Sequence, residues 1–233
     1  MNDITNGDEE KLEVTEVNSN ATFFETFYET IEVMKTNISS FSGYIVAAAF
    51  IQTLTLMASG ATDTPTIITI ALIEVFIGTL IEVLFLNSFY SKLTDIEFSV
   101  RKSLWDYPTY IFYKLGFTLL FIIGSILLVI PGLLVAFFYS FSPIVAILFD
   151  SDDRGILSKT KQLVSKQYGL YACVFAIAIV VGSFDLASSQ IVGVIGKGLF
   201  LIIPYSLILT LVSFASTALV VTFLQKMSQS HRC

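Results

Sequence analysis

Charged side chains are scarce in this sequence. Only 14% of its 233 residues are Asp, Glu, Lys or Arg, whereas 55% are hydrophobic, and the mean hydropathy is +0.78. A soluble domain carries about 25% charged residues, so this chain has too little charge to cover a globular surface. The composition therefore indicates an integral membrane protein.

Histidine and cysteine are also rare. His231 is the single histidine, Cys173 lies within an apolar block, and Cys233 is the last residue. No zinc site, Ser–His or Cys–His pair, or disulfide framework can be assembled from them, and no Gly-rich phosphate loop is present. We therefore expect no cofactor, no metal and no enzymatic activity. The net charge of −6 gives no reason to expect a nucleic-acid partner.

The apolar residues form continuous blocks rather than the alternating pattern of barrel strands. A helix needs about 20 apolar residues to cross a bilayer, with a range of about 17–25. The sequence predicts an all-α polytopic membrane protein whose six transmembrane helices form three hairpins. The blocks are 44–60, 67–87, 110–130, 133–149, 170–190 and 198–224.

The rest of the chain divides into tails and short basic segments. Residues 1–20 carry a net charge of −5 and too little apolar surface to fold, so we expect a disordered acidic tail. The membrane domain is predicted over 21–226, with a second tail at 227–233. Because the first 20 residues are polar, we expect the first membrane helix to serve as an uncleaved signal.

Three short amphipathic segments precede the first, third and fifth blocks, and we expect them to lie at the membrane interface. They are 22–40, 92–107 and 154–168. Their spacing has two explanations. Either the chain contains three parallel repeats, or the loops on one side simply carry the basic residues that set topology.

The central hairpin contains the clearest signals for a turn and a kink. Pro131 and Gly132 separate the third and fourth blocks and predict a turn. Pro143 lies inside the fourth block and predicts a kink, because its ring clashes with the carbonyl of Tyr139.

Three stretches of this region resemble the YciC-like bacterial inner-membrane proteins and the similar membrane domain of some glycerophosphodiester phosphodiesterases. They are 130–133 (IPGL), 138–143 (FYSFSP) and 157–164 (LSKTKQLV). The sequence departs from the family pattern at Ile156, Thr160 and Lys166, where Ala, Ser and Gly are usual. The resemblance covers residues 130–168. It implies the architecture of a multi-pass inner-membrane protein and transfers no catalytic residue.

The basic residues predict the orientation. With six crossings and both termini in the cytoplasm, twelve of the 13 Lys and Arg residues lie inside and only Lys197 lies outside. This asymmetry follows the positive-inside rule.

Acidic residues inside apolar blocks are the main candidates for a functional site. Glu74 and Glu82 flank Gly78 at four-residue intervals on one helix, and Asp185 lies near the outer end of the fifth block. Intramembrane acids are costly and commonly functional, so a proton-coupling or cation-binding site is one interpretation. The other is that these groups are protonated or hydrogen-bonded and only fix helix packing.

The basic segments also have two interpretations. Their lysines and arginines either bind anionic lipid at the interface or only determine topology. The residues are Arg101, Lys102, Lys159, Lys161 and Lys166.

The leading functional interpretation is a non-enzymatic membrane protein for membrane homeostasis, lipid organisation or assembly of membrane-protein partners, including a second copy of itself. The alternative is a small transporter that uses Glu74, with Glu82 or Asp185, for proton or cation coupling. A lipid-modifying enzyme ranks third, because no acid or base beyond these carboxylates can be nominated.

Overall fold

The computed structural model describes residues 22–58, 64–127, 129–149, 155–195 and 199–229. Every regular element in these ranges is a helix. They are α1 (Phe23–Thr36), α2 (Ile38–Ala58), α3 (Thr64–Ile73), the π-helical turn η1 (Glu74–Gly78), α4 (Thr79–Thr94), α5 (Val100–Leu127), α6 (Val129–Tyr139), α7 (Ser142–Leu148), α8 (Ile156–Lys166), α9 (Tyr168–Ile195) and α10 (Leu199–Gln229). The predicted tail at 1–20 lies outside the described residues.

The protein is an all-α polytopic membrane protein. Five helical stretches in the described ranges are long and apolar enough to cross a bilayer, and there are six if the bent α8–α9 pair forms one span. The α3–η1–α4 unit forms one such stretch of 31 residues. The helices extend beyond the apolar blocks because polar residues at their ends continue the same hydrogen-bonding pattern.

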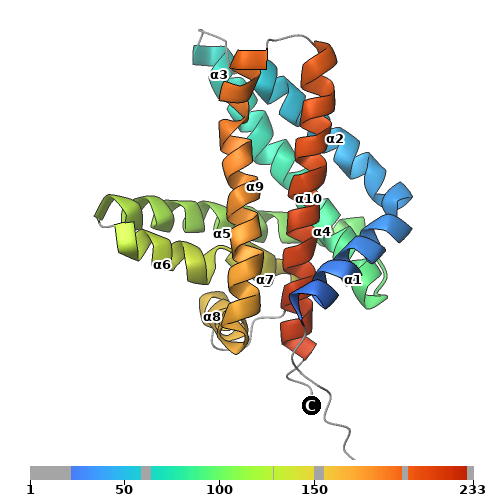
Figure 1. The fold of residues 1–233 in the computed structure, drawn as a ribbon, viewed down its shortest axis with the longest axis vertical. Coiled ribbons are helices and arrows are strands. Elements are labelled where there is room, and N and C mark those ends of the chain that lie inside the picture. Colours follow the sequence, from blue (N-terminus) through green and yellow to red (C-terminus); the bar gives the residue numbers. More distant parts are fainter. Residues whose placement is uncertain (1–21, 59–63, 128, 150–154, 196–198, 230–233) are drawn as a thin grey trace, which may run out of the picture.

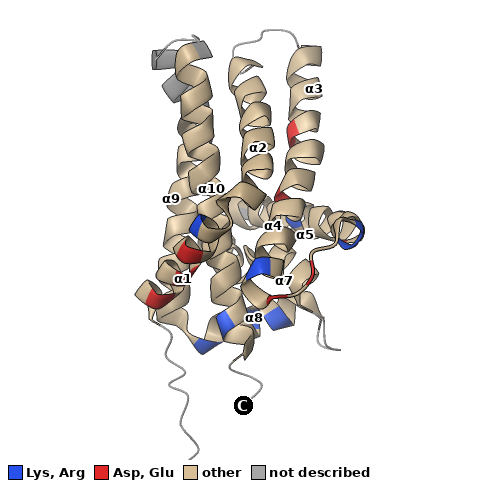
Figure 2. Ribbon diagram, turned by 90° about the vertical axis from the view of Figure 1, so that its right-hand side faces the viewer, with Lys and Arg blue, Asp and Glu red and all other residues tan. Residues whose placement is uncertain are grey.

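The long helices form a bundle around α10. This helix contacts α1, α2, α4, α8 and α9, and Figure 1 shows α9 and α10 side by side along the long axis. In contrast, the α5–α6 hairpin runs across that axis (Figure 1). The described Lys and Arg residues lie toward one end of the bundle, around α1, α7 and α8 (Figure 2).

The turn of the α5–α6 hairpin is not where Pro131 and Gly132 predicted it. Helix α5 ends at Leu127 and α6 begins at Val129, so both residues lie in the first turns of α6. Proline is tolerated there because the first N–H groups of a helix have no partner within the helix. Gly132 instead allows close packing, since a Cβ atom built on Gly124 would lie 3.0 Å from its Cα.

Pro143 lies at a break in the fourth apolar block. Helix α6 ends at Tyr139, and α7 begins at Ser142 with Pro143 in its first turn. The proline therefore starts a new helix instead of bending a continuous one, because a proline suits the first helical turn better than the interior.

The amphipathic segments have different outcomes. The first and third form separate helices, α1 and α8. The second segment, 92–107, does not form a helix of its own. Helix α4 runs through Lys92 to Thr94 and is terminated by Asp95 in the left-handed conformation, with φ of 53°, which Asp tolerates better than most residues. The later part of this segment continues into the long helix α5.

Helix α1 packs on the bundle through its threonines. Thr26 and Thr30 are buried, and the Thr30 hydroxyl donates to the Thr222 hydroxyl of α10 at 3.0 Å. Phe24 and Tyr28 remain exposed on the outer side. Small polar residues suit contacts between helices in a membrane, where hydrophobic contact gives little driving force.

Candidate functional site

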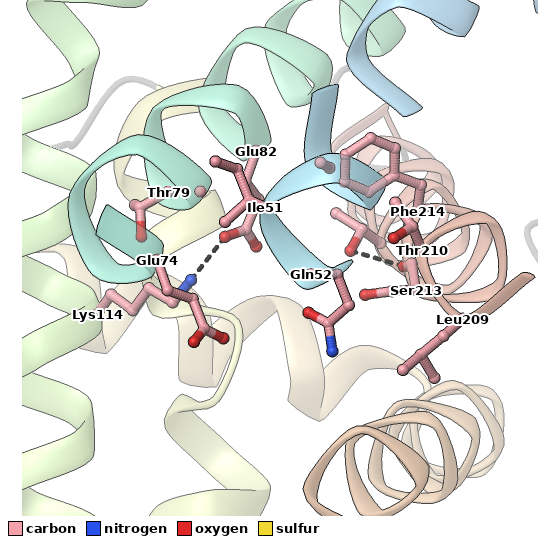
Figure 3. Close-up of a pocket in the computed structure, with 13 residues that line it drawn as sticks. Ile51, Gln52, Glu74, Thr79, Glu82, Lys114, Leu209, Thr210, Ser213 and Phe214 are labelled. Atoms are coloured by element: carbon pink, nitrogen blue, oxygen red, sulfur yellow. Dashed lines mark hydrogen bonds and ion pairs between the residues drawn. The ribbon is translucent and has the colours of Figure 1, made fainter. Parts of the chain in front are cut away.

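A polar cavity of about 220 Å³ lies between α2, the η1–α4 junction, α5 and α10. Figure 3 shows its side chains converging from these elements. Charged groups enter from η1, α4 and α5, whereas α10 supplies mainly hydroxyl groups. The lining residues are Ala48, Ile51, Gln52, Glu74, Gly78, Thr79, Glu82, Lys114, Leu209, Thr210, Ser213, Phe214 and Thr217.

Glu82 is neutralised by a residue from α5. The Lys114 ammonium lies 2.6 Å from one carboxylate oxygen of Glu82 (Figure 3). The hydroxyl of the buried Tyr110 donates to the other oxygen at 2.8 Å. Tyr110 and Lys114 are four residues apart, so they lie on the same face of α5 and both reach Glu82.

Glu74 has a different environment. One of its carboxylate oxygens accepts a hydrogen bond from the Thr55 hydroxyl of α2 at 3.2 Å. Among the described residues, the ion pairs are Lys114–Glu82 and Lys226–Glu29, so Glu74 has no cationic partner there. The three charged groups of the cavity therefore leave one carboxylate unneutralised.

The depth of Glu74 makes this charge unusual. It follows Thr64, the first residue of α3, by ten residues, which corresponds to about 15 Å along the helix. A hydrocarbon core is about 30 Å thick, so Glu74 lies near its middle if α3 begins at the membrane surface. A charged side chain at this depth is costly unless an opposite charge or hydrogen bonds compensate it.

The backbone around Glu74 is also irregular. Residues Glu74–Gly78 form a π-helical turn, a feature that occurs mostly as a single-turn bulge and often at functional sites. The Phe76 carbonyl in this turn accepts a hydrogen bond from the Tyr107 hydroxyl of α5 at 3.0 Å. Helix α5 therefore contacts this unit through both Tyr107 and the Tyr110–Lys114 pair.

Three acids were predicted from the sequence to form this site. The structure brings Glu74 and Glu82 to the same cavity, together with Gly78. The side chain of Asp185 lies outside the described residues, so no placement is assigned to it. Lys114 was missed, because it was counted only as a topology-determining charge. Its position inside an apolar block, four residues after Tyr110, could have identified it as a site residue.

The five basic residues proposed to contact lipid do not form one cluster. Lys102 and Lys159 line a second cavity, and Arg101 is exposed beside it in sequence. The Lys161 ammonium lies 6.0 Å from the ring centroid of Phe138. Lys166 donates to the Met227 carbonyl near the end of α10 at 2.6 Å, so it serves an internal contact.

The described residues contain no group of three or more His, Cys, Asp and Glu side chains arranged to hold a metal ion. Comparisons with protein-family models, curated proteins and solved structures find no match to this chain.

Proposed function

We propose that this membrane protein is a small transporter and that Glu74 binds its coupling ion, a proton or a small cation. The observation that carries this proposal is the unequal pairing in the polar cavity. Lys114 neutralises Glu82, whereas Glu74 faces the cavity and has only a hydroxyl partner among the described residues. A single uncompensated carboxylate in a low-dielectric site gains most from a bound positive charge.

The cavity also offers groups that could orient a small solute. Gln52 lies on α2, and Thr210 and Ser213 lie on α10, so donors and acceptors face Glu74 across the cavity (Figure 3). Ligand sites generally combine an apolar wall with a few convergent polar groups. The apolar part of the wall includes Phe214, which stacks on Phe85 of α4 with ring centroids 4.3 Å apart.

We further propose that both termini face the cytoplasm of a bacterium, that the protein resides in the inner membrane, and that it belongs with the YciC-like proteins. The concentration of described Lys and Arg residues at one end supports this orientation (Figure 2). The family proposal rests on the resemblance over residues 130–168.

Lipid organisation or partner assembly is the second candidate function, and one observation favours it. The α5–α6 hairpin crosses the bundle axis (Figure 1) and exposes large apolar side chains, with Phe112, Ile126 and Ile130 each more than 70% exposed. An apolar element lying across neighbouring helices could order lipid chains or receive a partner helix.

The transport proposal is tested with the full chain in proteoliposomes. Capacitive currents on a solid-supported membrane are recorded for a panel of amines, amino acids and sugars, with and without a pH or sodium gradient. We expect a coupled current for at least one solute in the wild type and its loss in Glu74→Gln. The matched control is Glu97→Gln, which removes an exposed carboxylate from the α4–α5 loop.

Two results would contradict the proposal. One is an undiminished coupled current in Glu74→Gln. The other is the absence of any current in the wild type, combined with a Glu74→Gln effect that is confined to the unfolding temperature. The second result would leave Glu74 as a packing residue.

A further inference from the structure

A second and larger cavity, of about 850 Å³, lies at the end of the bundle where the basic residues gather (Figure 2). Its walls come from the end of α4, the start of α5, α7, α8 and the last turns of α10. It shares no lining residue with the Glu74 cavity. The two sites can therefore be altered independently.

The described lining of this cavity carries balanced charge. Lys102 of α5 and Lys159 of α8 contribute two positive charges, and Asp95 and Asp106 contribute two negative charges. Lys102 and Asp106 lie four residues apart on one face of α5. Asp106 accepts a hydrogen bond from the Asn87 amide at 3.1 Å, which fixes one negative charge in the wall. Balanced charge matches a zwitterion better than an anion or a cation.

The side-chain oxygen of Gln225 is a hydrogen-bond acceptor without a donor among the described residues, so a ligand of this cavity should supply an N–H or O–H group. Gln225 lines the cavity, and this oxygen is buried. A buried polar atom without a partner is energetically costly. A ligand that supplies an N–H or O–H group at this point would remove that cost.

Part of the remaining wall is apolar, beside the polar groups of Tyr90, Thr94, Ser228 and Gln229. Ile147, Leu148 and Phe149 follow one another at the end of α7 and face the same cavity. Nearby on α5, Trp105 is 75% exposed, which is typical of an indole at the boundary between water and hydrocarbon. The described lining thus joins balanced charge to an apolar surface, and this combination favours an amphiphile.

We infer that this cavity binds a phospholipid whose headgroup combines a phosphate with a primary ammonium, as in phosphatidylethanolamine. The phosphate is recognised by Lys102 and Lys159, in charge-assisted contacts. The ammonium is recognised by the carboxylates and donates to Gln225. A choline headgroup has no N–H to donate, and a glycerol headgroup leaves a net negative charge.

The test uses the full chain in nanodiscs that contain phosphatidylcholine, phosphatidylethanolamine and phosphatidylglycerol in equal amounts. Native mass spectrometry after release from the nanodisc counts the lipids that stay bound. We expect phosphatidylethanolamine to be retained at least about tenfold over the other two lipids, a ratio that needs about 1.4 kcal/mol of preference.

A matched pair of double variants separates the cavity from general surface charge. Lys102→Gln with Lys159→Gln removes both phosphate contacts, and Arg101→Gln with Lys161→Gln removes the same charge from neighbouring positions on the same two helices. We expect the first variant to lose retention about tenfold and the second to keep it. Gln225→Leu should lower the preference for ethanolamine over choline.

Three outcomes would overturn the inference. Equal losses in the two double variants would mean attraction to surface charge alone. Equal retention of phosphatidylglycerol would remove the role of the ammonium. Complete displacement of the lipid by soluble phosphoethanolamine at millimolar concentration would identify a soluble phosphoamine as the ligand. None of these outcomes bears on transport through Glu74, so failure of one proposal can be told from failure of the other.

Discussion

The pairing of Glu82 with Lys114 controls how much charge remains in the polar cavity. The Lys114 Nζ and Glu82 Oε2 atoms are 2.6 Å apart, and the two side chains are 43% and 24% exposed. This exposure places the pair between a buried ion pair, which is costly to break, and a surface pair, which contributes little. Tyr110 strengthens the site by donating to the second oxygen of Glu82.

This pair predicts non-additive effects on stability. Glu82→Gln or Lys114→Met alone should each lower the free energy of unfolding by about 1–3 kcal/mol, because each leaves one charge uncompensated. The double variant should cost less than the sum of the two. Unfolding in mixed detergent, followed by circular dichroism, measures all three.

The second described ion pair serves as the control for this cycle. Lys226 and Glu29 link α10 to α1 at 2.7 Å, outside the polar cavity. A coupling of about 0–1 kcal/mol is expected there, because the side chains are similarly exposed, at 22% and 41%, but no described hydroxyl donates to Glu29 as Tyr110 donates to Glu82. Strictly additive costs at Glu82 and Lys114 would show that the two charges are solvated separately.

At the scale of single helices, the α5–α6 hairpin depends on two glycines. A Cβ atom on Gly132 would lie 2.8 Å from the backbone nitrogen of Ser125, and one on Gly124 would lie 3.0 Å from Gly132. These contacts are with backbone atoms, which cannot rotate away as a side chain can. The two helices approach this closely only because neither residue has a side chain.

Gly132→Ala should therefore destabilise the hairpin by about 1–3 kcal/mol, the usual cost of overpacking. Gly116→Ala, on the same hairpin, is the matched control because a Cβ atom there meets nothing within 4 Å. We expect it to be neutral or slightly stabilising, since alanine favours helix. Thermal unfolding and the rate of proteolysis at the hairpin measure both effects, and equal behaviour of the two variants would refute close packing.

The π turn at Glu74–Gly78 also belongs to this scale. A π turn closes hydrogen bonds over one more residue than an α-helical turn, so it changes the rotation between Glu74 and Glu82. Spacing on an ideal α-helix predicted that both acids share one side. The structure adds that the irregular turn separates a neutralised acid from an uncompensated one within the same cavity.

At the scale of the whole molecule, charge is distributed along the bundle axis. The described Lys and Arg residues gather toward one end of the bundle (Figure 2). The start of α3 lies at the opposite end (Figure 1). The proposed orientation places the basic end in the cytoplasm, in agreement with the positive-inside rule.

Single cysteines test this orientation in cells of a bacterial host, in a background with Cys173 and Cys233 replaced by serine. Thr64→Cys, at the start of α3, should react with a membrane-impermeant maleimide in intact cells. Glu97→Cys, in the loop between α4 and α5, should react only after permeabilisation. The reverse pattern would invert the proposed topology. The cysteine-free background, without either introduced cysteine, controls for other reactive sites.

The helical class, the apolar spans and the presence of two glutamates within one apolar block followed from the sequence alone. These properties depend on local composition and on the length of each apolar block relative to the bilayer. Other features depend on contacts between distant segments. They include the pairing of Lys114 with Glu82 across 32 residues, the approach of Gly124 to Gly132 and the joining of Lys102 and Lys159 in one cavity. Only the tertiary structure decided these, because each helix can rotate and cross its neighbours in many ways that leave its apolar length unchanged.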